Sequence, residues 1–143
     1  LLETIAKRPD GLPYGSNGVG SFTHLSMELL RTLVGVPMTH VPYRGSAPLL
    51  TDMVAGTIPV ALDGLATSKP QVTAGGALRA IGVTSARRFR AMPDVPAIAE
   101  TVPGFDPVPC QNVTLVAGAT TTVTGGFVVE IPRPVIASIT RKV

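Results

Sequence analysis

A glycine-rich segment in front of a predicted helix offers the clearest chemistry in this sequence. Residues 15–21 read Gly-Ser-Asn-Gly-Val-Gly-Ser, and an apolar periodicity that fits a helix begins directly after them. The first N–H groups of a helix lack intrahelical partners and carry a partial positive charge, and glycines let a ligand approach the backbone closely. The pattern indicates an anion-binding site, although a tight turn without a ligand also explains the glycines.

The spacing of these glycines argues against the two common nucleotide loops. Counting from Gly18 and Gly20, the third position of the dinucleotide pattern G-x-G-x-x-G is Thr23, and the acidic residue expected about 20 positions later at a strand end is missing. A phosphate loop needs Gly-Lys-Ser or Gly-Lys-Thr, which this segment does not contain. An anion other than a nucleotide phosphate therefore fits the loop better.

A second segment, Arg44-Gly45-Ser46, repeats the arrangement of strand, short turn and helix start. Loops that follow the strands of a parallel sheet all emerge at its carboxyl edge, where open α/β sheets bind ligands. We therefore expect the two helix starts to face the same side, with Ser46 either capping its helix, contacting a ligand, or doing both. Asp63 ends a predicted apolar strand, where its carboxylate either accepts a hydrogen bond from a ligand or fixes the next loop.

The other reactive side chains do not form a recognisable catalytic or metal-binding set. His24 and His40 lie 16 positions apart without a third ligand at metal-binding spacing, so we interpret both as structural. The sequence has no G-x-S-x-G nucleophile elbow, and Cys110, its single cysteine, stands among prolines. These observations argue against an enzyme, and we expect no catalytic residue, cofactor or metal.

Composition places the chain among small folded domains and argues against nucleic acid as a partner. Its 143 residues fit one domain, 45% of them are apolar, and 15 glycines with 14 prolines imply short elements joined by tight turns. The net charge is only +3, and aromatic residues make up 4%, too few rings for a platform that stacks single-stranded bases. The basic run at Arg87, Arg88 and Arg90 is typical of a solvated turn.

Helices and strands alternate along the part of the chain that carries these residues. Apolar spacing predicts a helix over residues 22–34, capped by Ser21 and ended by Gly35. Its core-facing stripe comprises Phe22, Leu25, Ser26, Leu29, Leu30, Leu33 and Val34. A second helix begins with Ser46 as its cap and ends at Gly56, and its inner face comprises Leu49, Leu50, Met53 and Val54.

Short strands separate these helices. The patterns predict strands at residues 36–41, 58–63 and 78–84, the second of them covered on both faces, and a short third helix at residues 68–74. This alternation is typical of an α/β fold with a mainly parallel sheet and helices on its faces.

Both ends of the chain are less regular. Residues 2–8 resemble the last turns of a helix, and residues 113–118 and 127–131 have strand composition with a hairpin-like connection between them. Residues 134–141 predict a closing helix.

Four longer segments together resemble the motifs of one family. They read YGSNGVGSFTHL at residues 14–25, HVPYRGSAP at 40–48, LRAIGVTSARR at 78–88 and MPDVP at 92–96. They are similar to the segments YGSxGxGSxxHL, HVPYKGSAP, LRALAVTSxxR and LPDVPT of the extracytoplasmic solute-binding proteins of tripartite tricarboxylate transporters, the Bug family. Several long motifs in one order are far more specific than a single glycine loop.

The resemblance implies a fold for the chain. Members of this family are two-lobed flytrap proteins with a periplasmic-binding-protein-like fold of type II. Residues 1–107 resemble the second lobe, which would be a three-layer α/β unit with a mainly parallel sheet. Residues 108–143 would form a crossover and a C-terminal segment, and the first lobe has no counterpart in this sequence.

The resemblance also implies a function and a site. Family members hold a di- or tricarboxylate or similar small organic acid between their lobes in the periplasm and deliver it to membrane transporter subunits. N–H and hydroxyl donors of the two helix starts would bind one carboxylate, partly through water, beside Asp63. The expected ligand-binding residues are Ser16, Asn17, Gly18, Gly20, Ser21, Gly45, Ser46, Ala47 and Asp63.

Two other classes of function stay open from the residues alone. A flavodoxin-like or Rossmann-like enzyme domain would use the loop from Gly15 to Gly20 for a phosphate group. A packing or oligomerisation module would self-associate through an apolar patch. If the flytrap interpretation is right, we expect this chain alone to bind its acid weakly, because one lobe does not enclose the ligand.

Overall fold

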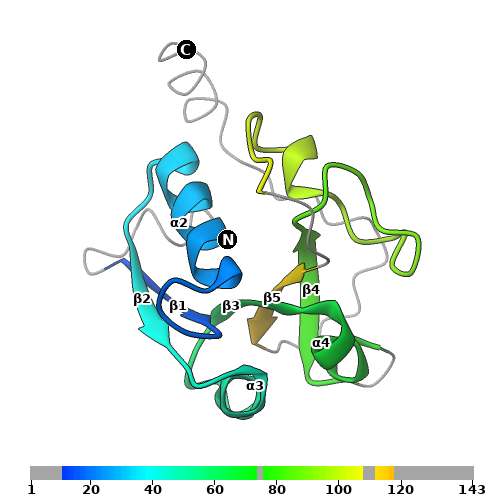
Figure 1. Ribbon diagram of the computed structural model, residues 1–143. Helices are drawn as coiled ribbons and strands as arrows, with labels where there is room; N and C mark the ends of the chain where they lie inside the picture. The colour runs from blue at the N-terminus through cyan, green and yellow to red at the C-terminus, as the bar shows by residue number, and fades with distance from the viewer. Residues whose placement is uncertain (1–10, 74–75, 108–111, 118–143) are drawn as a thin grey trace.

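A computed structural model describes residues 11–73, 76–107 and 112–117 of the chain (Figure 1). The elements in these ranges are β1 (Leu12–Ser16), α2 (Phe22–Val34), β2 (Met38–Pro42), α3 (Ser46–Val54), β3 (Val60–Gly64), α4 (Leu65–Val72), β4 (Leu78–Val83), the 3₁₀ turn η1 (Ile98–Glu100) and β5 (Asn112–Ala117). The predicted elements at residues 2–8, 120–126, 127–131 and 134–141 lie outside the described residues. No helix of the described part is long and apolar enough to cross a membrane.

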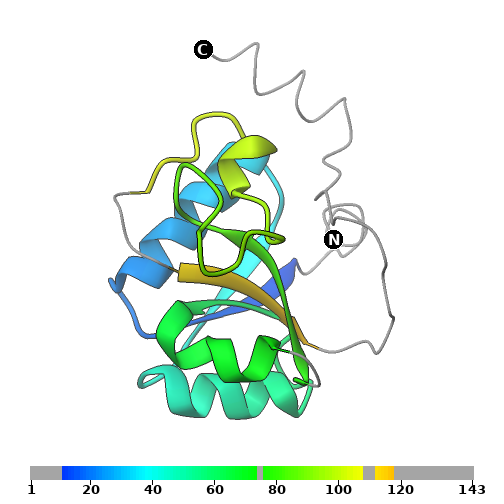
Figure 2. The same ribbon diagram turned by 90° about the vertical axis from the view of Figure 1, so that its right-hand side faces the viewer.

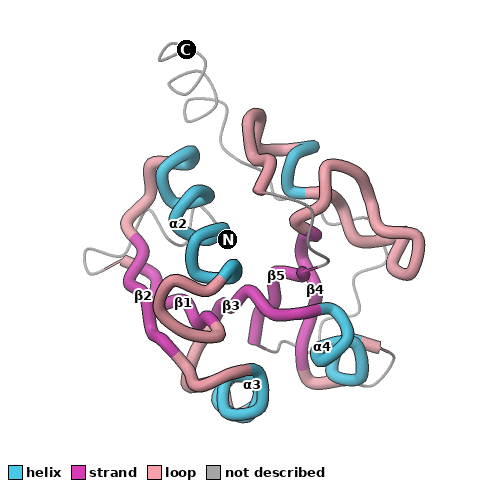
Figure 3. Tube along the Cα trace, viewed as in Figure 1, coloured by secondary structure: helices cyan, strands magenta, loops and turns pink. Residues whose placement is uncertain are grey.

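One sheet holds the described strands together in the order β2-β1-β3-β5-β4 (Figure 3). β1 pairs in parallel with β2 and with β3, while β5 runs antiparallel between β3 and β4. β4 therefore runs in the same direction as β1, β2 and β3, which confirms the mainly parallel sheet. β5 belongs to this sheet although it follows residue 107 in the chain. The predicted division of the chain at residue 107 stays a prediction.

The sheet is covered on both faces, so the fold has three layers. α2 and η1 lie on one face, and α3 and α4 lie on the other (Figures 1 and 2). Val60 and Leu62 of β3 pack in the core on the α2 side, whereas Ala61 packs with Leu49 and Met53 of α3. These residues are at most 1% exposed, which confirms the predicted burial of this strand on both faces and makes apolar burial the main stabilising contribution.

The bounds of α2 agree with the prediction, but its buried face is rotated. Ser21 caps the helix by accepting a hydrogen bond from the His24 N–H group, and Gly35 ends it with a φ of 64°. Leu25, predicted to face the core, is 59% exposed, and Met27 is buried instead. Thr23 is also buried, and its Oγ1 accepts a hydrogen bond from the Asn17 N–H group of the preceding loop.

The starts of α3 and α4, unlike that of α2, differ from the prediction. Ser46 is the first residue of α3 and not its cap, because its hydroxyl donates to Asp63 while Gly45 takes the cap position. α4 begins at Leu65, directly after β3, so Ser68 lies inside the helix. Val54 of α3 was also assigned wrongly to the inner face, since it is 49% exposed.

β1 was not predicted as a strand, although it lies inside the sheet. The glycine-rich pattern suggested that the loop starts at Gly15, but β1 extends to Ser16. A Cβ atom at Gly15 would collide with the side chain of Leu49. Glycine at this position therefore allows α3 to pack closely on the strand.

Candidate functional site

The carboxyl ends of three parallel strands lie at one edge of the sheet. Ser16 of β1 is in register with Pro42 of β2, and β3 runs parallel to β1 and ends at Gly64. The glycine loop, the turn before α3 and the start of α4 therefore emerge on the same side. This confirms the sequence prediction that the two helix starts face the same side of the sheet.

Asp63 ties these segments together. Its Oδ1 atom accepts hydrogen bonds from Ser46 Oγ at 2.6 Å and Asn17 Nδ2 at 2.9 Å. Its Oδ2 atom accepts from the hydroxyls of Thr67 and Ser68, each at 2.7 Å. One buried carboxylate thus joins the glycine loop, the start of α3 and the first turns of α4.

The carboxylate of Asp63 is ionised although it is 0% exposed. Burial alone would raise its pKa, but the four hydrogen bonds outweigh burial and hold the pKa below its ordinary value. No Lys or Arg in the described residues forms an ion pair with it. Hydroxyl, amide and helix-start dipoles therefore balance this charge, which makes Asp63 the group that fixes the loops.

The serine hydroxyls of the site already have protein partners. Ser46 Oγ donates to Asp63, and Ser21 Oγ donates to the Gly18 carbonyl at 2.7 Å. Ser16 Oγ lies 3.2 Å from the Gly18 carbonyl oxygen and 2.6 Å from a ring nitrogen of His40. These hydroxyls are therefore already used, and the turns offer backbone N–H groups as donors to an anion.

The start of α3 presents such N–H groups. Gly45 at the cap position has no side chain, and no described side chain caps the helix. Pro48 has no N–H group, and the N–H group of Leu49 pairs with the carbonyl of the cap residue, as the fourth residue of an α-helix does, so the first-turn donors without an intrahelical partner belong to Ser46 and Ala47. Ala47, the second residue of α3, is exposed. An anion at this position would interact favourably with the helix dipole.

The glycine loop uses its N–H groups mainly to hold its own shape. Asn17 N donates to Thr23 Oγ1 at 3.0 Å, Gly18 N to Ser16 Oγ at 3.3 Å, and Gly20 N to His24 Nδ1 at 3.0 Å. Gly18 and Gly20 have φ values of 129° and 75°, which favour glycine. The loop is thus a preorganised wall of the site, with Gly20 exposed near its tip.

The structure brings most of the predicted residues into one network but leaves their contact with a ligand as a prediction. Asn17, Ser46 and Asp63 are mutually bonded, and the Asn17–Ser46 contact is 3.4 Å long. The Asn17 Oδ1 atom is buried and has no partner among the described residues.

Sequence reasoning missed Thr67 and Ser68 as residues of this network. They stand four and five positions after Asp63, and the predicted helix started too late to place them beside it. A helix that begins directly after the strand would have shown that both hydroxyls lie over the carboxylate. His24 and His40, interpreted as structural, lie next to the glycine loop with their rings stacked.

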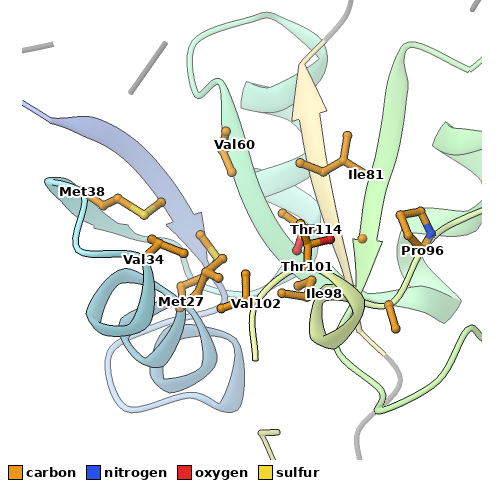
Figure 4. A pocket seen from close by; sticks show the side chains of 13 residues that line it. Met27, Val34, Met38, Val60, Ile81, Pro96, Ile98, Thr101, Val102 and Thr114 are labelled. Carbon is orange, nitrogen blue, oxygen red and sulfur yellow. The ribbon is translucent and has the colours of Figure 1, made fainter. Parts of the chain in front are cut away.

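A cavity lies apart from this network. An apolar cavity of about 50 Å³ opens between α2 and residues 96–102, above the sheet (Figure 4). Its lining includes Met27, Val34, Val60, Ile81 and Ile98 but none of the predicted site residues. In the described part of the chain, no three His, Cys, Asp or Glu side chains are grouped as metal ligands.

Comparisons with known proteins point to one family. The sequence pattern of the tripartite tricarboxylate transporter family receptor matches residues 1–124. A protein from the tcbD-tcbE intergenic region of Pseudomonas sp. strain P51 is 41% identical over 108 residues, which cover 74% of this chain and 32% of that relative. The chain therefore spans about a third of this relative's length.

Solved structures share the fold. R. palustris Rpa4515 with adipate superposes with a TM-score of 0.71 at 34% identity, over 98% of this chain and 43% of that one. The periplasmic binding protein BugD superposes with a TM-score of 0.68 at 26% identity, also over 98% of this chain and 43% of that one. The chain thus has the fold of one part of a periplasmic-binding-protein-like molecule.

Proposed function

We propose that this chain, which belongs to the tripartite tricarboxylate transporter receptor family, forms one face of a binding site for a small carboxylate. The observation that carries the proposal is the uncapped start of α3, which Asp63 joins to the glycine loop. The structure of Rpa4515 with adipate supports this ligand class. The family description supports transport as the purpose of binding.

Backbone dipoles would supply most of the attraction. A ligand carboxylate near Ala47 would accept hydrogen bonds from the N–H groups in the first turn of α3, where the helix dipole favours negative charge. Asp63 is also negative, but its four donors already neutralise part of its field. Binding of this kind makes and breaks no covalent bond, so we assign the chain to a receptor and not to an enzyme.

The site would be completed by a second surface. The chain spans 43% of the Rpa4515 and BugD chains, and the remaining part of such a protein would close over the ligand. Closure excludes water and adds contacts, whereas opening releases the ligand. We place the whole protein in the periplasm, because BugD is a periplasmic binding protein, and assign membrane transporter subunits as the recipients of its ligand.

Titration of the chain with adipate and succinate, followed by NMR, tests this function. We expect shifts at the amides of Ser46, Ala47 and the glycine loop, with affinity weaker than micromolar, because one face alone does not enclose the acid. Micromolar or tighter binding would contradict the one-face interpretation. Titration with nucleotides and flavins is the matched comparison, since stronger binding of those compounds would favour a phosphate-binding enzyme domain.

Substitutions at Ala47 give a sharper version of the test. Ala47→Glu places a negative charge at the start of α3, where it stabilises the helix but repels a carboxylate ligand. Ala47→Gln has nearly the same size without the charge. We expect the Glu variant to lose carboxylate binding by about tenfold or more, and the Gln variant to stay within about threefold of the parent chain. Equal binding by both variants would contradict a ligand at this helix start.

A further inference from the structure

Two histidines from different elements stack behind the glycine loop. His24 lies in the first turn of α2 and His40 in β2, and their ring centroids are 3.8 Å apart with an interplanar angle of 12°. The ring of Tyr14 in β1 also stacks on His40, with the two ring centroids 5.1 Å apart. The three rings thus form a layer that crosses from the sheet to α2.

Each imidazole contacts a different part of the loop. His40 Nε2 lies 2.6 Å from Ser16 Oγ, where the loop leaves β1. His24 Nδ1 accepts the N–H group of Gly20 at 3.0 Å, near the exposed tip of the loop. Ser16 in turn contacts both the N–H group and the carbonyl of Gly18. Hydrogen bonds of the two imidazoles therefore hold both the beginning and the tip of the loop.

Hydrogen bonds between side chains hold the Tyr14 end of this layer in place. The Tyr14 hydroxyl donates to Glu28 at 2.7 Å, and Glu28 is bound through its other oxygen by Arg31 at 2.7 Å. Tyr14 is 0% exposed, and burial followed by the bond to Glu28 raises the pKa of its hydroxyl. The hydroxyl therefore keeps its proton and its bond, and the rings keep a fixed support.

We propose that His24 and His40 are positioning residues that set the shape of the glycine loop and thereby the affinity of the carboxylate site. This inference rests on the proposed function, but its structural part concerns the loop alone. A ring nitrogen that accepts an N–H group carries no proton, so His24 acts as a neutral imidazole protonated at Nε2. We assign the positioning role of His24 to its Nδ1 acceptor and not to the size of its ring.

The glycines explain why the loop needs this support. Gly18 and Gly20 adopt positive φ values, and glycine has many other accessible conformations. If Gly20 loses its acceptor, only a fraction of molecules will hold the loop in the binding shape. The apparent affinity then falls in proportion to that fraction. His24 therefore acts on the ligand through the loop and without touching it.

A pair of substitutions at His24 separates the acceptor from the ring. His24→Phe keeps an aromatic ring for stacking on His40 but removes the acceptor, whereas His24→Asn removes the ring and offers an oxygen close to the former Nδ1 position. We expect His24→Phe to bind adipate about fivefold to tenfold more weakly in an NMR titration, and His24→Asn to bind within about twofold of the parent chain. The reverse order would overturn the proposal.

A readout without ligand tests the loop directly. We expect the nitrogen NMR shifts of His24 to show the Nε2-protonated tautomer, and the Gly20 amide to exchange with solvent several times faster in His24→Phe but not in His24→Asn. Unchanged Gly20 exchange in a folded His24→Phe chain would overturn the proposal. If the parent chain binds no carboxylate, the proposed function fails, while the exchange data still decide the role of His24.

Substitutions at His40 provide a second route should His24→Phe unfold. His40→Gln keeps a polar atom within reach of Ser16, whereas His40→Leu removes it. We expect the amides of residues 16–20 to shift and exchange faster in His40→Leu, and to stay close to the parent values in His40→Gln. The same spectra from both variants would contradict a positioning role for His40.

Discussion

Among single residues, Asp63 contributes most to the arrangement of the site. It is fully buried and ionised, and each of its oxygens accepts two hydrogen bonds. The donors come from the glycine loop, α3 and α4, so the carboxylate holds together segments that are distant in sequence. A charge in this position is stable only while all its donors remain in place.

Asp63→Asn is expected to lower the free energy of unfolding by about 2–4 kcal/mol, because an amide replaces an acceptor oxygen by a donor that faces other donors. Chemical denaturation with urea measures the change. Asp52→Asn is the matched control, since Asp52 is only half-buried and its carboxylate accepts one bond from the described residues, that of the Tyr43 hydroxyl at 2.9 Å. Equal losses for the two variants would show that the Asp63 network contributes little.

The titration of His40 predicts how stability depends on pH. Burial lowers the pKa of His40 below its ordinary 6.5, although Glu28 acts in the opposite direction. The unfolded chain therefore binds a proton first as pH falls, so the stability contributed by neutral His40 is complete above pH 6.5 and is lost below it. We expect a smaller loss of unfolding free energy between pH 7 and pH 5 for His40→Gln than for the parent chain, measured by urea denaturation. A parallel loss in both proteins would contradict this assignment.

Among the helices and strands, helix ends follow from their local sequence more directly than helix faces do. Ser21 and Gly35 mark the ends of α2 because capping needs only the chemistry of neighbouring residues. The exposed position of Leu25 depends instead on how α2 lies on the sheet. The start of α3 also depends on tertiary contacts, because the Ser46 hydroxyl donates to Asp63 and does not cap the helix.

Gly35 allows a test of the left-handed helix end. Its φ is 64°, and no atom lies within 4 Å of the position that a Cβ would take. Gly35→Ala should therefore lower the free energy of unfolding by about 1 kcal/mol through backbone strain alone. Gly35→Asn should cost less, because asparagine tolerates this conformation. Thermal denaturation of the two variants gives the comparison, and an unchanged midpoint for Gly35→Ala would contradict the strain.

Across the molecule, two core clusters on opposite faces of the sheet hold the layers together. The apolar cavity beside α2 belongs to one of these faces (Figure 4). Thr114 of β5 lines it, and its Oγ1 atom is buried without a partner among the described residues. A polar atom in such surroundings destabilises the fold.

Thr114→Val should raise the free energy of unfolding by about 1 kcal/mol, because it replaces an unpaired hydroxyl by a methyl group of the same shape. Thr23→Val is the matched control, since Thr23 is also buried but its Oγ1 accepts the Asn17 N–H group. We expect the control to lower stability by a similar amount. Urea denaturation measures both changes, and a loss of stability in Thr114→Val would contradict the unpaired state of its hydroxyl.

The amino-acid sequence was sufficient to predict the alternation of elements, the ends of α2, the burial of β3 on both faces and the common edge of the two helix starts. These features depend on periodicity, on glycine and serine at helix ends, and on the parallel direction of the strands, all of which are local or follow from general rules of connection. The family motifs added the fold, which the comparisons confirmed.

Which groups meet at that edge depends on the tertiary structure. Asn17, Ser46, Thr67 and Ser68 are up to 51 positions apart, and their convergence on Asp63 depends on strand order and register. The stacking of His24 on His40 likewise requires α2 to lie on the sheet at one particular angle. Hydrogen-bond direction is fixed by these long-range contacts, because a hydroxyl donates to the strongest acceptor within reach, which its neighbours in sequence do not reveal.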